Sequence, residues 1–243
     1  MNLTYLRAEI LRLMRNKRVL IFSILMPAVL LLIFGGLYKK DVLNGTSAAA
    51  YLMVSMGLFG SMSAAIGSGG SIAVERGIGW NRQLRLTPLR PVNYLLTKVV
   101  LSLVMALPPI LITYAVGAVT LDVRLPAQTW LLIAAGSWLG ALPFAALGLV
   151  IGYIAKPDSV QQISGLLYML LAAFGGIWVP VEQMPDLMHR IAEWTPTYWV
   201  GQIARSPLFH QAWTMHEVWM LALWTVVFSL VAVRRFRRDT ARA

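Results

Sequence analysis

The side chains best suited to bind a partner lie in one basic segment, ERGIGWNRQLRLTPLRPVNYLLTK, which runs from Glu75 to Lys98. Trp80, Arg82 and Arg85 alternate there with apolar residues, and the Thr-Pro pair that ends at Pro88 would stop a short amphipathic segment. Tryptophan and arginine are enriched at the centres of protein interfaces. The same residue types also anchor loops to lipid headgroups. The segment therefore predicts contact with either a protein or a membrane surface.

Residues that could catalyse a reaction or hold a metal are sparse in this chain. It has three histidines and no cysteine, and His216 beside Glu217 lacks the HExxH spacing that a zinc hydrolase needs. The sequence also lacks the GxxxxGK[S/T] loop that cradles ATP phosphates. It therefore predicts no catalytic residue, no metal site and no cofactor on this chain.

The composition indicates a membrane protein. Apolar residues make up 58% of the 243 positions and charged residues only 13%, whereas about a quarter of a soluble protein is charged. The apolar residues gather in runs of roughly 20, the length that crosses a bilayer as a helix. Six such runs are predicted as transmembrane helices, at residues 19–38, 48–74, 95–119, 130–154, 160–179 and 218–233.

The basic residues predict the orientation of these helices. If both termini lie on one side, 16 of the 21 Lys and Arg residues fall on that side, including those of the Glu75 segment. Lysine and arginine collect in cytoplasmic loops, so both termini are expected in the cytoplasm. Apolar residues also recur at helical spacing in residues 1–18, with Glu9 and Arg12 on the opposite side. They predict either an amphipathic helix in the membrane interface or a basic flank that only sets the orientation.

Two further patterns constrain the membrane domain. Every Asp, Glu and His is expected in a loop or near the end of a span, which disfavours an ion-coupled transporter, because such a protein needs charged groups in mid-membrane. Small residues recur at four-residue steps, which predicts close helix packing within the chain or across a dimer. These steps join Gly136 to Gly140, Gly148 to Gly152, Gly60 to Ala64 and Ser68, and Ser63 to Gly67 and Ser71.

Two stretches resemble the membrane subunits of ABC-2 type transporters. In the Glu75 segment the likeness lies in the Glu-Arg pair, a glycine, a basic and leucine stretch, Thr-Pro-Leu, and Tyr-Leu-Leu before Lys98. The stretch MPDLMHRIAEWTPTYWVGQIAR, residues 184–205, is similar to the part of the family before its last helix. Trp80 departs from the small residue of the family, and Trp-Thr-Pro at 194–196 departs from its Asn-Pro.

This resemblance implies an all-α membrane domain over residues 1–243 that dimerises with itself or a paralogous permease. It also implies a separate ATPase subunit that binds ATP and Mg²⁺, location in the plasma (inner) membrane, and no nucleic-acid partner. Residues 75–94 would be the cytoplasmic coupling loop, and residues 180–217 a re-entrant region at the outer face. The implied ATPase-coupling residues are Glu75, Arg76, Trp80, Arg82, Leu84, Arg85, Thr87 and Pro88. The implied residues of the outer cap are Pro185, Pro196, Tyr198 and Arg205.

The expected activity is export of a hydrophobic or amphiphilic compound, such as a drug, an antibiotic or a lipid, by alternating access. A pathway poor in charge suits such a molecule, although the same side chains could simply pack in the core. The candidate path residues are Met53, Met56, Phe59, Tyr168, Phe174 and Trp178.

The alternative is a membrane-embedded enzyme or assembly scaffold that acts on lipids. Its best acid or base groups would be His189, Glu193 and His210.

Overall fold

The helices of the protein run along one long axis. The computed structural model describes residues 3–15, 17–39, 41–43, 45–79 and 91–241. The membrane-domain helices are α2 (Lys17–Leu37), α3 (Ala48–Gly77), α5 (Pro91–Thr120), α6 (Ala127–Leu139), α7 (Ala141–Ile154), α8 (Val160–Phe174) and α11 (Met215–Ala241). The shorter elements are α1 (Leu3–Arg15), β1 (Val42–Leu43), β2 (Thr46–Ser47), η1 (Val181–Gln183), α9 (Asp186–Glu193), α10 (Pro196–Arg205) and η2 (Ser206–Phe209).

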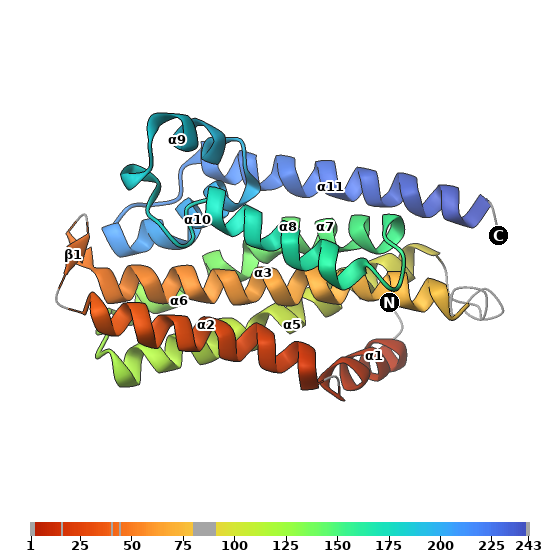
Figure 1. Cartoon of the computed structure of the whole chain (residues 1–243), viewed down its shortest axis with the longest axis horizontal. Helices are drawn as coiled ribbons and strands as arrows, with labels where there is room; N and C mark the ends of the chain where they lie inside the picture. Colours follow the sequence, from red (N-terminus) through yellow and green to blue (C-terminus); the bar gives the residue numbers. More distant parts are fainter. Residues whose placement is uncertain (1–2, 16, 40, 44, 80–90, 242–243) are drawn as a thin grey trace.

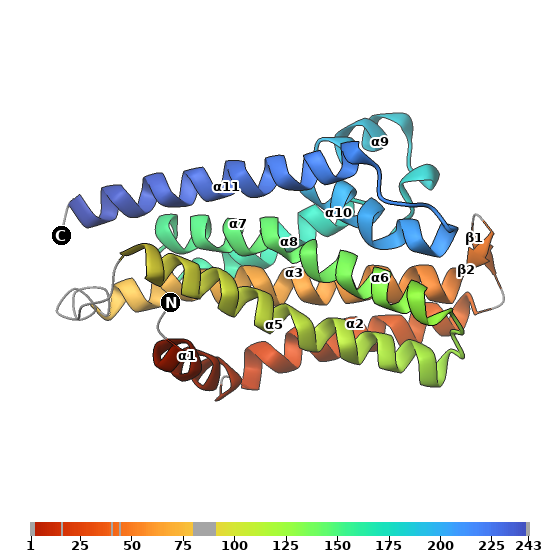
Figure 2. The ribbon, with the colours of Figure 1, turned by 180° about the vertical axis from the view of Figure 1, so that it is seen from behind.

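The two ends of the bundle differ in what they carry (Figure 1). One end holds the antiparallel pair of β1 and β2, with α9 and α10 beside it on the flank. The other end holds α1, both chain termini and the end of α3 that leads toward α5 (Figures 1 and 2). The connections predicted for one side of the membrane thus lie together at one end of the bundle.

Helix α3 is the centre of the bundle. It contacts α2, α5, α7 and α8. Helices α2 and α8 are on the side of the bundle nearer the viewer in Figure 1, and α5 and α7 are on the nearer side in Figure 2. Its membrane-length stretch is 89% buried, because alanine, glycine, serine and methionine occur on all sides of the helix and let its neighbours approach. The main core, from Leu31 through Met53 to Leu208, is built around it.

The prediction of a helical membrane protein is confirmed. In the described residues, four helical stretches are long and apolar enough to cross a membrane: Ala48–Gly77, Asn93–Thr120, Ala127–Ile154 and Met215–Asp239. Ile21–Leu37 and Val160–Phe174 are shorter apolar helices. The two-residue strands β1 and β2 are the one departure from an all-α chain that these residues show. The count of six spans stays a prediction.

Several predicted boundaries shift for local reasons. The run 130–154 is divided between α6 and α7 at Gly140, because Pro143 has no N–H to bond the carbonyl four residues earlier. The run 160–179 ends as a helix at Phe174, where Gly175 and then Gly176, at φ +78°, turn the chain. Pro108 and Pro109 lie inside a continuous α5.

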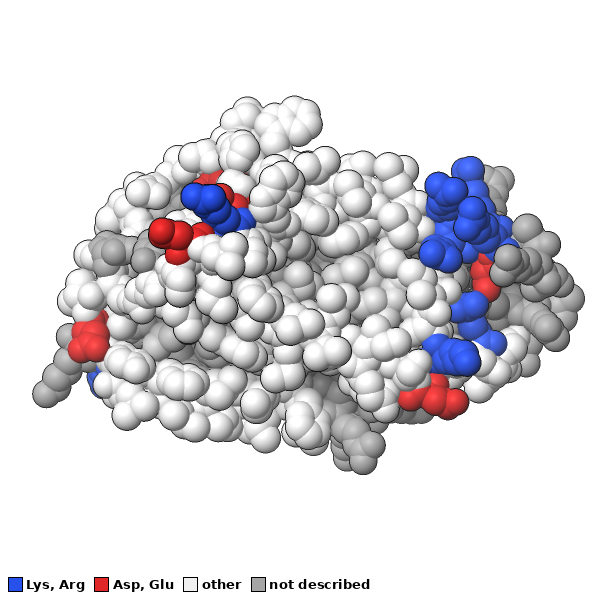
Figure 3. All heavy atoms as spheres, turned by 45° about the horizontal axis from the view of Figure 1, so that its top comes forward, with Lys and Arg blue, Asp and Glu red and all other residues white. Residues whose placement is uncertain are grey.

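Charge is concentrated at one end of the face shown in Figure 3. The blue cluster lies at the end where α11 finishes, and α11 carries the exposed residues Arg234, Arg235, Arg237 and Arg238 there. A broad uncharged surface separates this cluster from the mixed charges toward the other end. The midpart of α11 exposes Leu223, Val226 and Leu230, as a helix that faces lipid would.

The glycine steps provide close packing within the chain. A Cβ on Gly148 would come within 2.7 Å of the carbonyl oxygen of Ile66, and one on Gly152 within 2.7 Å of that of Gly69, so α7 and α3 are in backbone contact. A Cβ on Gly136 would lie 3.0 Å from the Ile203 carbonyl oxygen on α10. The structure therefore shows intrachain packing at Gly136, Gly148 and Gly152, whereas a role of these steps in a dimer stays a prediction.

We expect Gly148→Ala to destabilise the protein, because its Cβ meets backbone atoms that cannot move aside. The free energy of unfolding should fall by about 1–3 kcal/mol, as in other overpacked sites. Thermal unfolding of the purified protein checks this, with Gly165→Ala as the matched control, since a Cβ on Gly165 meets nothing within 4 Å. Equal midpoints for the two variants would contradict the packing that we describe.

Candidate functional site

Two neighbouring residues in the last turn of α3, Glu75 and Arg76, connect this helix to different partners. Successive side chains on a helix point about 100° apart, so the two residues face different neighbours. Glu75 faces α1 and α5, whereas Arg76 faces α7 and α11. Both lie within five residues of Trp80, where the segment predicted to bind a partner continues.

Glu75 is the centre of a buried ion cluster. Its side chain is fully buried, as is that of Lys98. The Lys98 Nζ lies 2.5 Å from Glu75 Oε1 and 2.7 Å from Glu9 Oε2. The Tyr94 hydroxyl donates to Glu75 Oε2 at 2.8 Å, and Arg12 Nη1 donates to Glu75 Oε1 at 3.1 Å. We call Glu9, Arg12, Glu75, Tyr94 and Lys98 the Glu75 cluster.

The Glu75 cluster is balanced in charge, since two carboxylates face one ammonium and one guanidinium. A buried ion is costly unless it is paired and hydrogen-bonded, and each partner here depends on the others. The cluster joins α1, α3 and α5, which are far apart in the sequence. It therefore fixes the amphipathic helix α1 to the ends of α3 and α5.

Arg76 forms a second set of contacts. Its guanidinium binds both Asp239 oxygens, with Nη2 at 2.6 Å from Oδ1 and Nε at 3.2 Å from Oδ2. Its Nη1 donates to the carbonyls of Tyr153 at 2.9 Å and Gly152 at 3.2 Å. These carbonyls belong to the last turn of α7, which has no further helical N–H to bond them. Arg76 thus caps α7 and ties it to α11 and α3.

Together the two residues form a mechanical junction. Their bonds tie the last turn of α3 to α1, α5, α7 and α11. In the Glu75 cluster the side chains of Glu9, Glu75 and Lys98 are buried and that of Arg12 is 44% exposed. The side chains of Arg76 and Asp239 are 27% and 30% exposed. The bonds of the two arginines are therefore more accessible to water than the bonds between Lys98 and its carboxylates.

The structure corrects the predicted positions of two coupling residues. Glu75 and Arg76 belong to helix α3, not to a loop, because the helix continues to Gly77. The Glu75 carboxylate is inside the bundle and not on the surface, because Lys98 holds it there. The other six coupling residues of the sequence prediction lie outside the described residues: Trp80, Arg82, Leu84, Arg85, Thr87 and Pro88.

The predicted polar face of the N-terminal helix also differs from expectation. Glu9 was expected to face away from the apolar side, toward water, but it is 4% exposed and bound to Lys98. Leu11 is instead 47% exposed. The carboxylate turns inward because it supplies a counter-ion for a buried lysine.

Of the predicted path residues, the structure brings together Phe59, Tyr168 and Trp178. The ring centroid of Phe59 lies 5.1 Å from that of Tyr168 and 5.6 Å from that of Trp178. Met53 and Met56 are buried in the core on the same helix as Phe59, and Phe174 is half-buried at the end of α8. These contacts are packing contacts, and a role in substrate passage stays a prediction.

The predicted cap residues lie in and beside α9 and α10. Pro185 directly precedes α9, and Pro196 begins α10, where its fixed φ suits the first helical position. The Tyr198 ring lies 4.9 Å from that of Trp199. Arg205 ends α10, is 3% exposed, and donates to Ser55 Oγ on α3. The region thus packs onto the central helix.

The three histidines have separate surroundings in the described part of the chain. His189 lies 3.8 Å from Glu193 on the same helix, with both side chains largely exposed. His210 is exposed after η2, and the His216 ring packs on Trp199. No group of three His, Asp or Glu residues suited to a metal occurs among the residues that the structure describes.

Sequence reasoning missed five members of the two contact sets: Glu9, Arg12, Tyr94, Lys98 and Asp239. Spacing held a partial signal, since Tyr94 and Lys98 stand one helical turn apart at the start of a span, as do Glu9 and Arg12 near the N-terminus. Nothing in the sequence pairs these two helices with each other or with α3. Asp239 is surrounded by arginines in the chain, and its partner is 163 positions away.

Comparisons with known proteins agree with this architecture. The model of the family described as ABC-2 type transporter matches residues 2–209. A protein of Bacillus subtilis (strain 168), named "Putative transport permease YvfS", is 34% identical over 237 residues, which cover 96% of each chain.

We expect Lys98→Met to destabilise the protein strongly, because the buried carboxylates of Glu9 and Glu75 would then share one cation, Arg12, whose side chain is 44% exposed. Loss of one partner of a buried pair costs about 3–5 kcal/mol. Adding Glu75→Gln to Lys98→Met should recover part of this loss, since it leaves one carboxylate beside one guanidinium. Thermal unfolding measures both effects.

Lys156→Met serves as the control, because Lys156 is exposed. If Lys98→Met and Lys156→Met unfold at the same temperature, the Glu75 cluster does not hold the helices together.

Proposed function

Because the chain belongs to the ABC-2 type transporter family, we propose that it is the permease subunit of an exporter that a separate ATPase subunit drives. The observation that carries this proposal is the junction at Glu75 and Arg76, which ties the start of the basic segment to four helices. The sequence has no phosphate-binding loop of its own, so the energy of ATP must enter through a contact with another chain.

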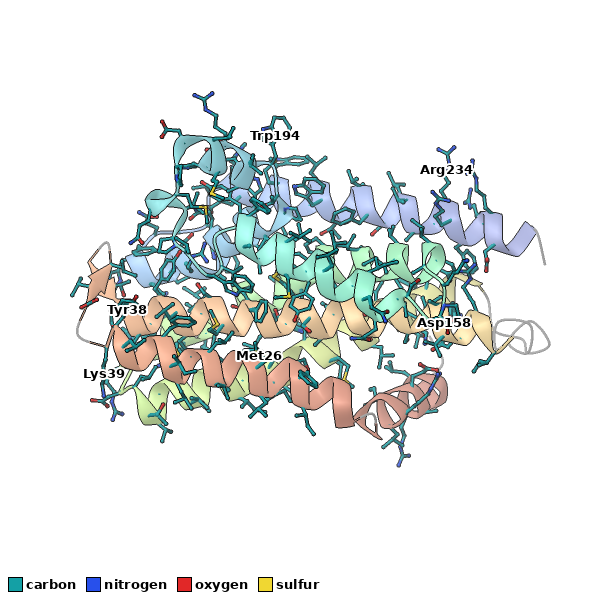
Figure 4. The ribbon with its side chains drawn as sticks, in the orientation of Figure 1. Met26, Tyr38, Lys39, Asp158, Trp194 and Arg234 are labelled. Carbon is teal, nitrogen blue, oxygen red and sulfur yellow. The ribbon has the colours of Figure 1, made fainter. Side chains whose placement is uncertain are left out.

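The proposed orientation places the α1 end of the bundle in the cytoplasm of the plasma (inner) membrane, with six spans. Arg234 and Asp158 lie toward this end, whereas Tyr38 and Lys39 lie at the opposite end (Figure 4). Met26, which is 45% exposed, lies between them on α2. Charged ends with an apolar belt between them support this orientation, as does the excess of arginine at the α11 end.

The proposed mechanism is alternating access in a dimer of this chain with itself or with a paralogous permease. ATP and Mg²⁺ bind the ATPase subunits, whose closure displaces residues 80–90. Glu75 and Arg76 then carry this displacement into the membrane helices, and a cleft between the two permeases opens outward. The α9–α10 region would form a re-entrant cap at the outer leaflet.

The proposed substrate is a hydrophobic or amphiphilic compound. The membrane-length part of α3 holds no charged side chain before Glu75, and Phe59, Tyr168 and Trp178 form an aromatic cluster there. Such a surface suits an apolar molecule better than an ion or a free sugar. The family and the name of the relative favour a transporter over an enzyme or scaffold that acts on lipids.

We expect a soluble P-loop ATPase to co-purify with this chain from native membranes in mild detergent, and to be lost when Trp80 and Arg82 are both changed to Ala. Mass spectrometry of the eluate identifies it. The matched control changes Trp194 and Arg190 to Ala. These residues are exposed at α9, so the control removes one tryptophan and one arginine side chain from the cap region instead. An ATPase that stays bound to the Trp80 and Arg82 variant would exclude this segment as the coupling element, and no ATPase in any eluate would exclude the exporter.

Arg76→Gln should separate binding from coupling. It leaves residues 80–90 intact but removes the bonds to α7 and α11, so the ATPase should still co-purify. Permease-dependent stimulation of ATP hydrolysis should fall roughly fivefold or more, the range of ordinary allosteric coupling. Arg234→Gln, an exposed site on α11, is the control. Full stimulation in Arg76→Gln would show that Arg76 carries no part of the coupling.

A further inference from the structure

Arg205 is a buried cation without a counter-ion among the described residues. It is 3% exposed, and no described carboxylate lies within 4.0 Å of its guanidinium. The other deeply buried cation, Lys98, contacts two carboxylates. A desolvated charge in a membrane domain is costly and is therefore a sign of function. The two buried cations thus have different roles.

The bonds that Arg205 does make are weak. Its Nη1 donates to Ser55 Oγ at 3.3 Å and to the Gly176 carbonyl at 3.4 Å. Hydrogen bonds from a guanidinium are usually about 2.7–2.9 Å when they are strong. The guanidinium carbon also lies 4.9 Å from the centre of the Tyr51 ring, which offsets part of the cost of burial. An anion would satisfy this group better than its present neighbours do.

A hydroxyl group without a hydrogen-bond partner in the described structure lies on the same side of α10 as Arg205. The Arg205 guanidinium folds back over Gly201, where a Cβ would come within 2.4 Å of Nη2. Thr197 stands one turn before Gly201, is fully buried, and has a hydroxyl without a hydrogen-bond partner in the described structure. Thr197 packs against Gly175, next to the Gly176 that Arg205 contacts. Arg205 and Thr197 therefore face the same turn of the chain.

Trp178 adds a third donor to this turn. Its indole N–H is buried and has no hydrogen-bond partner in the described structure. Its ring contacts Phe59, one helical turn from the Ser55 that Arg205 bonds. Residues 175–178 thus contact a guanidinium at Gly176 and the side chain of Thr197 at Gly175, and carry an indole N–H at Trp178, whereas the acceptors that the guanidinium bonds are Ser55 and Gly176. A surplus of donors around a cation is the chemistry of an anion site.

We propose that Arg205, with Thr197 and Trp178, binds the anionic headgroup of an amphiphilic substrate, a phosphate or a carboxylate, while the aromatic cluster contacts its apolar tail. This proposal rests on the proposed export function and narrows its substrate class. The headgroup reaches Arg205 when the turn at Gly175–Gly176 separates from α3, as alternating access requires. The long bonds to Ser55 and Gly176 are the contacts that the headgroup replaces.

The test is binding of dodecyl phosphate and dodecanoate to the purified permease in neutral dodecyl maltoside micelles, compared with dodecyltrimethylammonium. The unfolding midpoint of the permease is measured as each probe is added. The affinity follows from the rise in this midpoint and is expressed as the mole fraction of probe in the micelle. We expect at least one anionic probe to bind better than the cationic one, and Arg205→Gln to weaken it about tenfold or more. Arg124→Gln removes an equal charge at an exposed site and should stay within about twofold of the wild type.

Two further variants keep the test decisive if Arg205→Gln does not fold. Thr197→Val and Trp178→Phe each remove a donor that has no partner in the structure, so they should fold normally. Each should nevertheless weaken the anionic probe several-fold, which a purely structural Arg205 does not explain. Unchanged affinity in both variants would overturn the proposal, as would equal binding of anionic and cationic probes or wild-type affinity in a folded Arg205→Gln.

The probes also separate the sources of the headgroup and the two levels of the proposal. A preference for dodecyl phosphate supports a phosphorylated amphiphile, and a preference for dodecanoate supports a carboxylate. Binding of the probes is measured without the ATPase, so the two proposals can fail separately. An anion preference with no co-purifying ATPase would contradict the proposed exporter and support the anion site. A co-purifying ATPase with no anion preference would support the exporter and contradict the anion site.

Discussion

The burial of Lys98 between the carboxylates of Glu9 and Glu75 is the interaction on which the arrangement of the bundle end depends. A charge removed from water must be paired, and here the partners come from other segments of the chain. Here it draws in α1 and the ends of α3 and α5. Ion pairs therefore attach the amphipathic helix α1 to the bundle.

The adjacent Arg76 connects this end of α3 to a second pair of helices. It uses the free carbonyls of α7 and the carboxylate of Asp239 as acceptors, so the last turn of α3 reaches helices on its other side. Two neighbouring residues thus connect α3 to most of the bundle just before the basic segment. Side-chain bonds thus join these helices at the end of α3.

The surroundings of Arg205, at the end of α10, differ from those of Lys98. Arg205 is as deeply placed as the Glu75 cluster, yet weak neutral acceptors and a ring take the place of carboxylates. Close backbone packing makes both regions possible, because Gly201 leaves room for the guanidinium and Gly69 and Gly148 let α3 and α7 touch. One domain thus combines a charge-balanced ion cluster with a buried cation that has no carboxylate within 4.0 Å among the side chains that the structure describes.

The sequence by itself determined the membrane character, the helical class and most helix positions, because apolar runs of bilayer length admit no other structure in lipid. It also marked the small-residue steps, and motif likeness pointed to the transporter family. Only the tertiary structure decided that Glu75 faces inward, that Glu9 leaves the polar face of its helix, and that Arg205 has no carboxylate beside it among the described residues. These outcomes depend on which helices meet, and pairs such as Arg76 and Asp239, 163 positions apart, leave no periodic signal in the chain.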